Sequence, residues 1–201
     1  MINSWDIGSI QGIKLRVHWT FLLLPLWIFA SAVSSGTGLA PALTHVLSVF
    51  AILGCVLLHE LGHAFAAQQF GIATRDITLL PIGGVAALER IPRVPLQELW
   101  IASAGPLVNV VIATIIFAIQ IISGPAISPA AQFFTQLMIA NLILVLFNLI
   151  PAFPMDGGRI LRSLLAFQLP YAKATAIAAR TGQLCAVGLG LFGLFSGQLM
   201  M

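Results

Sequence analysis

Charge is what this chain of 201 residues lacks most. Only 7% of its residues are charged, against roughly a quarter in an ordinary soluble domain. A water-soluble globular protein, a disordered tail or a coiled coil needs more polar side chains than this to face water, so the composition excludes all three classes. The nine Lys and Arg residues give a net charge of +3 and make no dense phosphate-binding patch, so no nucleic-acid partner is predicted.

The few charges leave long apolar stretches between them. Glu60 is the single charged residue between Val17 and Thr74, and none occurs in residues 99–155 or 181–201. A helix that crosses the bilayer core needs about 20 apolar residues. The sequence therefore predicts an all-α polytopic membrane protein with about five to six transmembrane helices. Five segments meet or approach the required length: residues 19–35, 42–70, 99–123, 133–150 and 174–195.

The basic residues predict how the chain is oriented. They lie before the first predicted span, between the second and third spans, and from the end of the fourth span to the first turns of the fifth span. Residues 36–41 and 124–132 carry no Lys or Arg. The positive-inside rule makes the basic side cytoplasmic and places the N-terminus there. Arg159 and Arg162 are expected to anchor the chain at the membrane surface.

One segment between the spans has the pattern of strands. Residues 77–88 contain two short apolar runs on either side of Gly83 and Gly84, which predicts a small membrane-associated β-hairpin or sheet.

The second span contains the pattern H-E-x-x-H, formed by His59, Glu60 and His63. Histidines four residues apart project from the same face of a helix, so both imidazoles can bind one metal ion, with Glu60 as general base for a metal-activated water. The pattern would arise by chance in roughly one such chain in a thousand. An ionisable residue inside a membrane is costly and is a functional candidate by default. A structural histidine pair with a protonated Glu60 is the alternative.

A catalytic zinc ion takes three protein ligands, so one more is needed. Cys55 lies about 12 Å along the helix axis from His63, too far to share its ion, and is expected to be a packing residue. Asp156 is the one carboxylate that follows the proline-interrupted end of the fourth span. We expect Asp156 to be the third ligand, with a helix N-cap as its alternative role.

At this point the sequence resembles the site-2 protease family of intramembrane zinc metalloproteases, especially its prokaryotic members. Four stretches carry the resemblance: HELGH at 59–63, NLIPAFPMDGG at 148–158, AGPLVN at 104–109 and GIKLRVHW at 12–19. The subgroup that the chain most resembles continues with a further span and a pair of cytoplasmic CBS domains, and neither is present here. We therefore expect residues 1–201 to be a single transmembrane metalloprotease domain.

The resemblance implies one Zn²⁺ ion held by His59, His63 and Asp156, with Glu60 as the catalytic glutamate and Asn148 near the scissile peptide. Asn148 and Asn109 are candidate substrate-binding residues, and an interhelical hydrogen bond is the alternative for each. Gly83 and Gly84 are further candidates, because the hairpin can offer a strand edge to an unwound substrate. The alternative role of this hairpin is to shield the site.

The predicted function is therefore hydrolysis of a peptide bond in or near a transmembrane segment of another protein, as in regulated intramembrane proteolysis. The expected partners are the lipid bilayer and a transmembrane protein substrate, and self-association is not predicted either way. The expected location is a prokaryotic inner membrane. A membrane transporter of zinc or another divalent metal is the alternative, but a transport route needs several polar groups along its length.

Overall fold

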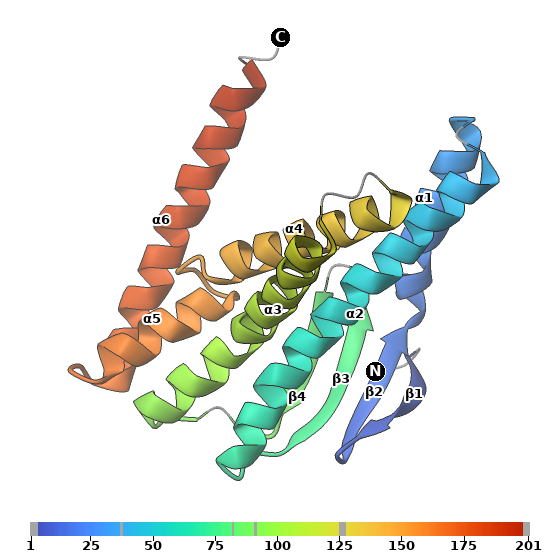
Figure 1. The fold of residues 1–201 in the computed structure, drawn as a ribbon. Helices are drawn as coiled ribbons and strands as arrows, with labels where there is room; N and C mark the ends of the chain where they lie inside the picture. Colours follow the sequence, from blue (N-terminus) through green and yellow to red (C-terminus); the bar gives the residue numbers. More distant parts are fainter. Residues whose placement is uncertain (1–3, 37, 82, 91, 125–127, 199–201) are drawn as a thin grey trace.

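A computed structural model of the protein describes residues 4–36, 38–81, 83–90, 92–124 and 128–198 (Figure 1). Most of these residues are helical, and a small sheet lies along one side of the helix α2. The elements, in chain order, are β1 (Ser4–Ile10), β2 (Ile13–His18), the 3-10 helix η1 (Trp19–Leu22), α1 (Leu23–Ser34), α2 (Leu39–Gln69), β3 (Thr74–Leu80), β4 (Gly83–Leu88), α3 (Pro95–Ser123), α4 (Pro129–Asn148), α5 (Asp156–Ala166) and α6 (Tyr171–Gln198).

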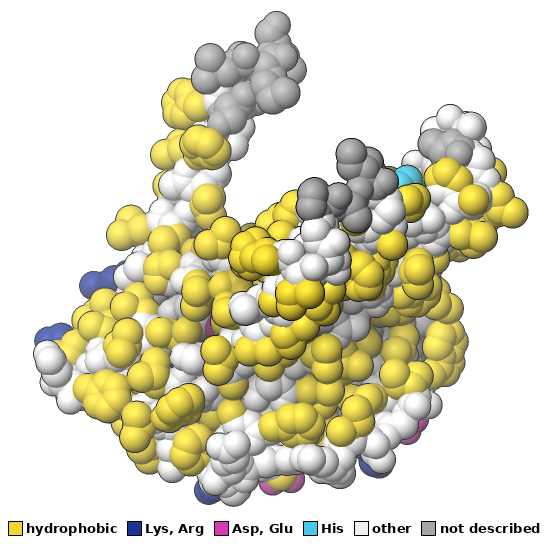
Figure 2. All heavy atoms as spheres, viewed as in Figure 1, with side chains coloured by type: hydrophobic (Ala, Val, Ile, Leu, Met, Phe, Trp, Pro, Cys, Tyr) yellow, Lys and Arg dark blue, Asp and Glu magenta, His cyan; other side chains and the backbone are white. Residues whose placement is uncertain are grey.

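Four of the described helices are long and apolar enough to cross a membrane: α2, α3, α4 and residues Tyr171–Phe195 of α6. At 1.5 Å per residue, the 31 residues of α2 span about 46 Å, more than the hydrocarbon core of roughly 30 Å. Hydrophobic side chains cover most of the face seen in Figure 2, and the visible Lys, Arg, Asp and Glu side chains lie in its lower half. The protein is a polytopic helical membrane protein, as the composition predicts.

The first predicted span, residues 19–35, is helical but not one continuous α-helix. It consists of the four-residue η1 followed by α1, which has 12 residues. Together they make an apolar helical segment, Trp19–Ser34, that is shorter than the other candidate spans. The described residues thus contain four helices of spanning length and this shorter helical segment.

The predicted hairpin is present and belongs to a larger sheet. β3 and β4 pair antiparallel, with Thr78 opposite Val85 and Leu80 opposite Gly83. β2 joins the other edge of β3 in parallel and β1 pairs antiparallel with β2, so the strand order is β1-β2-β3-β4. β4 is thus an edge strand of this sheet.

The core that positions the site lies between the sheet and α2. Ile13 of β2 and Ile77 of β3 pack against Leu61 and Ala64 of α2, and all four are buried. On the next face of α2, a Cβ atom at Gly62 would come within 2.9 Å of the Ala104 carbonyl oxygen of α3. The sheet and α3 therefore hold α2 on two faces, and the segment 59–63 sits between them.

Candidate metal centre

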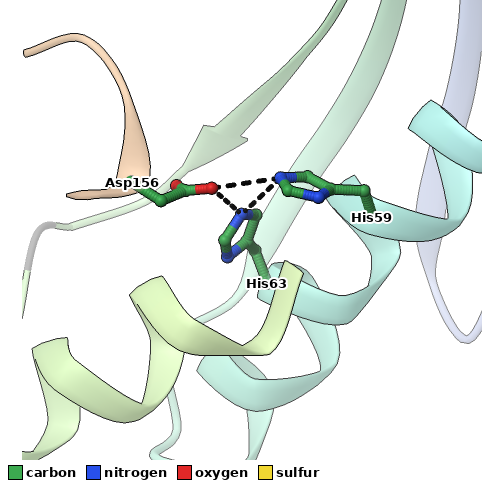
Figure 3. Close-up of side chains that lie close together, drawn as sticks. All are labelled: His59, His63 and Asp156. Atoms are coloured by element: carbon green, nitrogen blue, oxygen red, sulfur yellow. Dashed lines mark hydrogen bonds and ion pairs between the residues drawn. The ribbon is translucent and has the colours of Figure 1, made fainter. Parts of the chain in front are cut away.

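Two histidines of α2 and one aspartate of α5 converge on a single point (Figure 3). His59 Nε2 lies 3.1 Å from His63 Nε2, and each of these nitrogens lies 3.1 Å from Asp156 Oδ2. All three residues are buried, with no more than 7% of their surface exposed. The one-turn spacing of the two histidines produces this geometry, because it places both rings on the same face of the helix.

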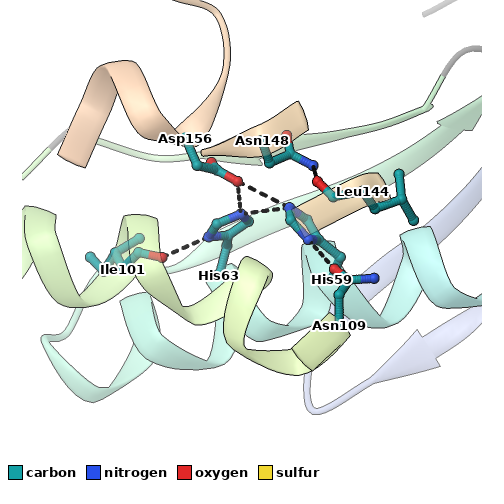
Figure 4. A network of polar contacts seen from close by, with 7 residues as sticks. All are labelled: His59, His63, Ile101, Asn109, Leu144, Asn148 and Asp156. Carbon is teal, nitrogen blue, oxygen red and sulfur yellow. Dashed lines mark hydrogen bonds and ion pairs between the residues drawn. The ribbon is translucent and has the colours of Figure 1, made fainter. Parts of the chain in front are cut away.

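The outer nitrogen of each imidazole has its own partner, as Figure 4 shows. His63 Nδ1 donates to the backbone carbonyl of Ile101 at 2.6 Å, and His59 Nδ1 donates to Oδ1 of Asn109 at 2.5 Å. A carbonyl oxygen only accepts hydrogen bonds, so the proton of a neutral imidazole is held on Nδ1. The Nε2 lone pairs then face inward, toward Asp156, which is the arrangement that metal-binding histidines have.

The three converging atoms fit a zinc ion. Two imidazole nitrogens and a carboxylate oxygen form the donor set of hydrolytic zinc sites. Tetrahedral zinc with bonds of about 2.0–2.1 Å places its ligand atoms about 3.3 Å apart, close to the 3.1 Å separations in this structure. Without a cation or a shared proton between them, three acceptor atoms at this distance would repel one another.

Asp156 reaches the histidines because the chain reverses sharply before α5. Met155 is the N-cap of α5 and Asp156 is its first residue, with its carboxylate turned toward α2. A Cβ atom at Gly157 would overlap the carbonyls of Leu149 and Ile150, so only glycine allows this tight path. Burial raises the pKa of the Asp156 carboxyl, but the contacts with the two imidazoles outweigh burial and hold that pKa below its ordinary value.

Glycine is also required on the α3 side of the site. A Cβ atom at Gly105 would approach His59 Nε2 to 2.7 Å and would overlap the ring of His63. Residue 105 therefore has to be glycine for α3 to pack this closely against the two imidazoles. This contact accounts for one residue of the AGPLVN stretch.

A cavity of about 520 Å³ opens beside the three converging side chains. Its wall includes His59, Glu60, His63 and Asp156 together with Gly83–Ala86 of β4. β4 passes close to the predicted general base, since a Cβ atom at Gly84 would lie 2.5 Å from Cγ of Glu60. The cavity thus combines a buried donor set, a carboxylate outside that set and an edge strand.

The predicted substrate-binding residues fall into two groups. Gly83, Gly84 and Asn148 line the cavity, and the amide nitrogen of Asn148 donates back to the Leu144 carbonyl at 3.0 Å. Asn109 is fully buried and does not line the cavity. Its side chain accepts from His59 of α2 and donates to Asn141 of α4, which matches the alternative interpretation, an interhelical hydrogen bond.

Two contributors to the site were not predicted from the sequence. Asn141 of α4, which is fully buried, accepts from Asn109 Nδ2 at 2.8 Å, and its own amide donates to Cys55 Sγ at 3.3 Å. A polar chain therefore runs from His59 through α3 to α4 and back to α2. The available signal was an amide side chain within a mostly apolar span. The Ile101 carbonyl has no sequence signal, because every residue carries one.

The expectation for Arg162 was wrong. It was predicted to anchor the membrane surface, but it is only 9% exposed and forms a buried ion pair with Glu98, including a 3.0 Å hydrogen bond from Nε to Oε1. Arg159, given the same role, lines the cavity beside the three converging side chains. The missing information was the position of Glu98, which lies 64 residues earlier in the chain.

The fold and the site define a membrane protein with a buried donor set of the hydrolytic zinc type. The chain belongs to peptidase family M50, whose sequence profile matches residues 47–127 and 119–189. It is 40% identical over 201 residues to the zinc metalloprotease MJ0392 of Methanocaldococcus jannaschii, covering 100% of this chain and 57% of that protein. It is 33% identical over 184 residues to stage IV sporulation protein FB of Bacillus subtilis, covering 91% of this chain and 58% of that protein.

A solved structure also matches the fold. The site-2 protease from Methanocaldococcus jannaschii superposes with a TM-score of 0.69 at 38% identity, covering 98% of this chain and 88% of that one. The resemblance to site-2 proteases is therefore confirmed, and these relatives favour a metalloprotease over a metal transporter. The chain spans a little over half the length of the curated relatives described above.

Proposed function

We propose that this protein is an intramembrane zinc endopeptidase that hydrolyses a peptide bond in or near a transmembrane segment of another protein. The observation that carries the proposal is the convergence of His59, His63 and Asp156, with both imidazoles oriented by partners on α3. The described residues contain this one group with metal-ligand geometry. A series of such groups, as a transport route would need, is not found among them.

One zinc ion would be held by His59 Nε2, His63 Nε2 and Asp156 Oδ2. When bound, the ion supplies Lewis acidity, which polarises the scissile carbonyl and makes the attacking water more acidic. Glu60 lines the same cavity and is not one of the three donors. Its carboxylate accepts the proton as the water oxygen bonds to the carbonyl carbon, and it gives that proton to the amine as the C–N bond breaks.

The edge strand β4 is the proposed substrate platform. A helical substrate hides its peptide bonds in its own hydrogen bonds, so it must unwind before attack. An unwound segment can then pair with the open edge of β4, whose residues Gly83–Ala86 line the cavity beside Glu60. Asn148, across the cavity, would donate its amide to the substrate backbone or to the developing oxyanion.

The proposed setting is a prokaryotic inner membrane with the N-terminus in the cytoplasm. The distribution of Lys and Arg between the spans supports this orientation. The metal centre lies toward the C-terminal end of α2, which in this orientation is the cytoplasmic end, so water has a short path to it. The relatives from Methanocaldococcus and Bacillus, both prokaryotes, support a prokaryotic origin.

The Glu60→Gln variant tests the catalytic role. Glutamine keeps the size of the side chain but cannot accept the proton, so cleavage of a co-reconstituted membrane-protein substrate should fall by about a hundredfold or more. Bound zinc, measured by elemental analysis, should stay at the wild-type level. Glu89→Gln is the matched control, because Glu89 is exposed and lies outside the cavity.

Cleavage by Glu60→Gln at the wild-type rate would overturn the assignment of Glu60. Absence of zinc from the gently purified wild-type protein would overturn the metal centre itself. Flux of zinc through the purified protein in vesicles, unaffected by Glu60→Gln, would instead favour the transporter.

A further inference from the structure

A second cavity, of about 760 Å³, lies apart from the metal centre. Its lining residues come from the segment between α2 and β3, the segment before α3 and the first turn of α3, α5 and the start of α6. No residue lines both this cavity and the one beside Glu60. The proposed protease chemistry leaves the second cavity without a role.

The wall of this cavity is rich in hydrogen-bond donors of positive charge. Arg90, Arg93 and Arg162 line it, which is three of the nine Lys and Arg residues in the whole chain. Gln97 and Tyr171 add uncharged polar side chains, whereas the Thr175 hydroxyl already donates to the Tyr171 carbonyl, and no Asp or Glu is among the lining residues. In a chain with so few charges, this concentration of guanidinium groups favours an anionic ligand.

Arg162 is held rigidly at the inner end of this set. Its guanidinium is paired with Glu98, which is fully buried, and lies 5.0 Å from the ring centres of both Phe153 and Tyr171. Nε and Nη2 contact Glu98, and Nη1 has no hydrogen bond among the described residues. Because the side chain is already fixed by folding, little further conformational entropy is lost when a ligand binds it.

Arg90 and Arg93 provide the net positive charge. Both are exposed, and neither has an ion-pair partner in the part of the chain that the structure describes. Arg90 makes one long contact, from Nη2 to the Gly71 carbonyl at 3.5 Å. Glu98 offsets the charge of Arg162, so about two positive charges face the cavity without compensation.

We propose that this cavity binds a phosphate group, carried either by an anionic lipid headgroup or by a small soluble phosphate compound. Guanidinium groups match phosphate oxygens with paired hydrogen bonds, and several arginines around one group are the typical arrangement for phosphate recognition. The cavity also lies at the helix ends where the basic residues of the chain gather, the level at which lipid phosphates are found.

Binding at this site would reach the metal centre through one short helix. Arg162 and Asp156 both belong to α5, which has 11 residues. A phosphate group bonded to Arg162 would therefore contact the same helix that carries the third donor of the zinc site. The binding proposal itself does not depend on whether the protein cleaves a substrate.

The test uses the full chain in phosphatidylcholine nanodiscs, with and without phosphatidylglycerol. Native mass spectrometry measures retained phosphatidylglycerol, and calorimetric titration measures binding of inorganic phosphate. The double variant Arg90→Gln/Arg93→Gln should weaken whichever probe binds by about tenfold or more, as expected for the loss of charge-assisted hydrogen bonds. The matched control is Arg75→Gln/Arg180→Gln, which removes two exposed arginines that do not line the cavity.

The two probes separate the sources of the phosphate group. Selective retention of phosphatidylglycerol without phosphate binding identifies a lipid headgroup, whereas phosphate binding in pure phosphatidylcholine identifies a soluble ligand. Failure of both probes to bind the wild-type protein would overturn the proposal. Equal weakening by the two double variants would also overturn it, because binding would then depend on surface charge alone. Unfolding temperatures measured without ligand confirm that all variants are folded.

Discussion

At the scale of single residues, each histidine of the metal centre uses both of its ring nitrogens. The inner nitrogens of His59 and His63 face Asp156, and the outer ones are held by Asn109 and the Ile101 carbonyl. The orientation of His59 therefore depends on α3, and through Asn141 on α4 as well. Buried amides of this kind act on a metal site by fixing the rings that would bind the ion.

The variant Asn141→Leu tests this dependence. Removing the amide frees Asn109 to rotate, so the His59 ring is no longer fixed, and zinc affinity should fall by about tenfold. A competition titration with a zinc chelator measures the affinity. Asn141→Asp, which keeps the acceptor oxygen for Asn109, should recover part of the loss.

Gln120→Leu is the control for Asn141→Leu. Gln120 donates to Thr135 at 2.9 Å between the same two helices, α3 and α4, but outside the polar chain of the metal centre. Its loss should leave zinc affinity unchanged. Equal loss of affinity in both variants would mean that general packing of α3 against α4, rather than the polar chain, sets the affinity.

At the scale of secondary-structure elements, the contact between β4 and α2 brings the proposed substrate platform to the proposed general base. The strand passes so close to Glu60 that residue 84 has no room for a side chain. The sheet is fixed to α2 by the buried contact of Ile13 and Ile77 with Leu61 and Ala64. The position of the β4 edge relative to Glu60 is therefore set by packing.

The variant Gly84→Ala should separate catalysis from metal binding. The added methyl group would displace Glu60, and a shift of about 1 Å in a catalytic group can lower the rate by on the order of a hundredfold. The three atoms nearest to this methyl group all belong to Glu60, so zinc content should stay constant. Cleavage rate and bound zinc are measured on the same preparation.

Gly54→Ala is the matched change for Gly84→Ala. It adds a methyl group to α2 where no atom lies within 4 Å of the new Cβ, so neither cleavage nor zinc content should change. A Gly84→Ala protein that cleaves at the wild-type rate would show that Glu60 and β4 are not in the close contact described above.

The elements could be predicted where their signals are local. The histidine pair and the hairpin were readable because a one-turn spacing and two apolar runs around glycines lie within short segments. Strands β1 and β2 were not predicted, since Lys14 and Arg16 in β2 resemble a polar flank when the parallel partner β3 is unknown. The bounds predicted for the first span, 19–35, agree with the apolar helical segment Trp19–Ser34, but apolar composition does not reveal that residues 19–22 form a 3-10 helix.

At the scale of the whole molecule, the metal centre links two parts of the chain that are distant in sequence. Asp156 lies 93 residues after His63, and the two meet through their buried side chains. A zinc ion would therefore join α5 to α2 as well as serve catalysis. Asp156 was predicted as a donor because the site lacked a third ligand and because topology brings the ends of the second and fourth spans to the same side.

Removal of zinc by a chelator should lower the thermal unfolding temperature. An ion that binds only the folded state at about a thousand times its dissociation constant stabilises that state by about 4 kcal/mol. Added zinc should restore the unfolding temperature. The Asp156→Asn variant should respond much less to the chelator, and an unfolding temperature of the wild-type protein that is insensitive to chelation would contradict the predicted donor set.

The arrangement of the sheet has a consequence for biosynthesis. β2 and β3 are neighbours in the sheet, yet residues 19–73, which include α1 and α2, separate them along the chain. During translation β1 and β2 are made first. β2 can pair with β3 only after α1 and α2 have been made. β4 is made later still, so under the proposed function a nascent chain would lack its substrate platform until residues 83–88 have been translated.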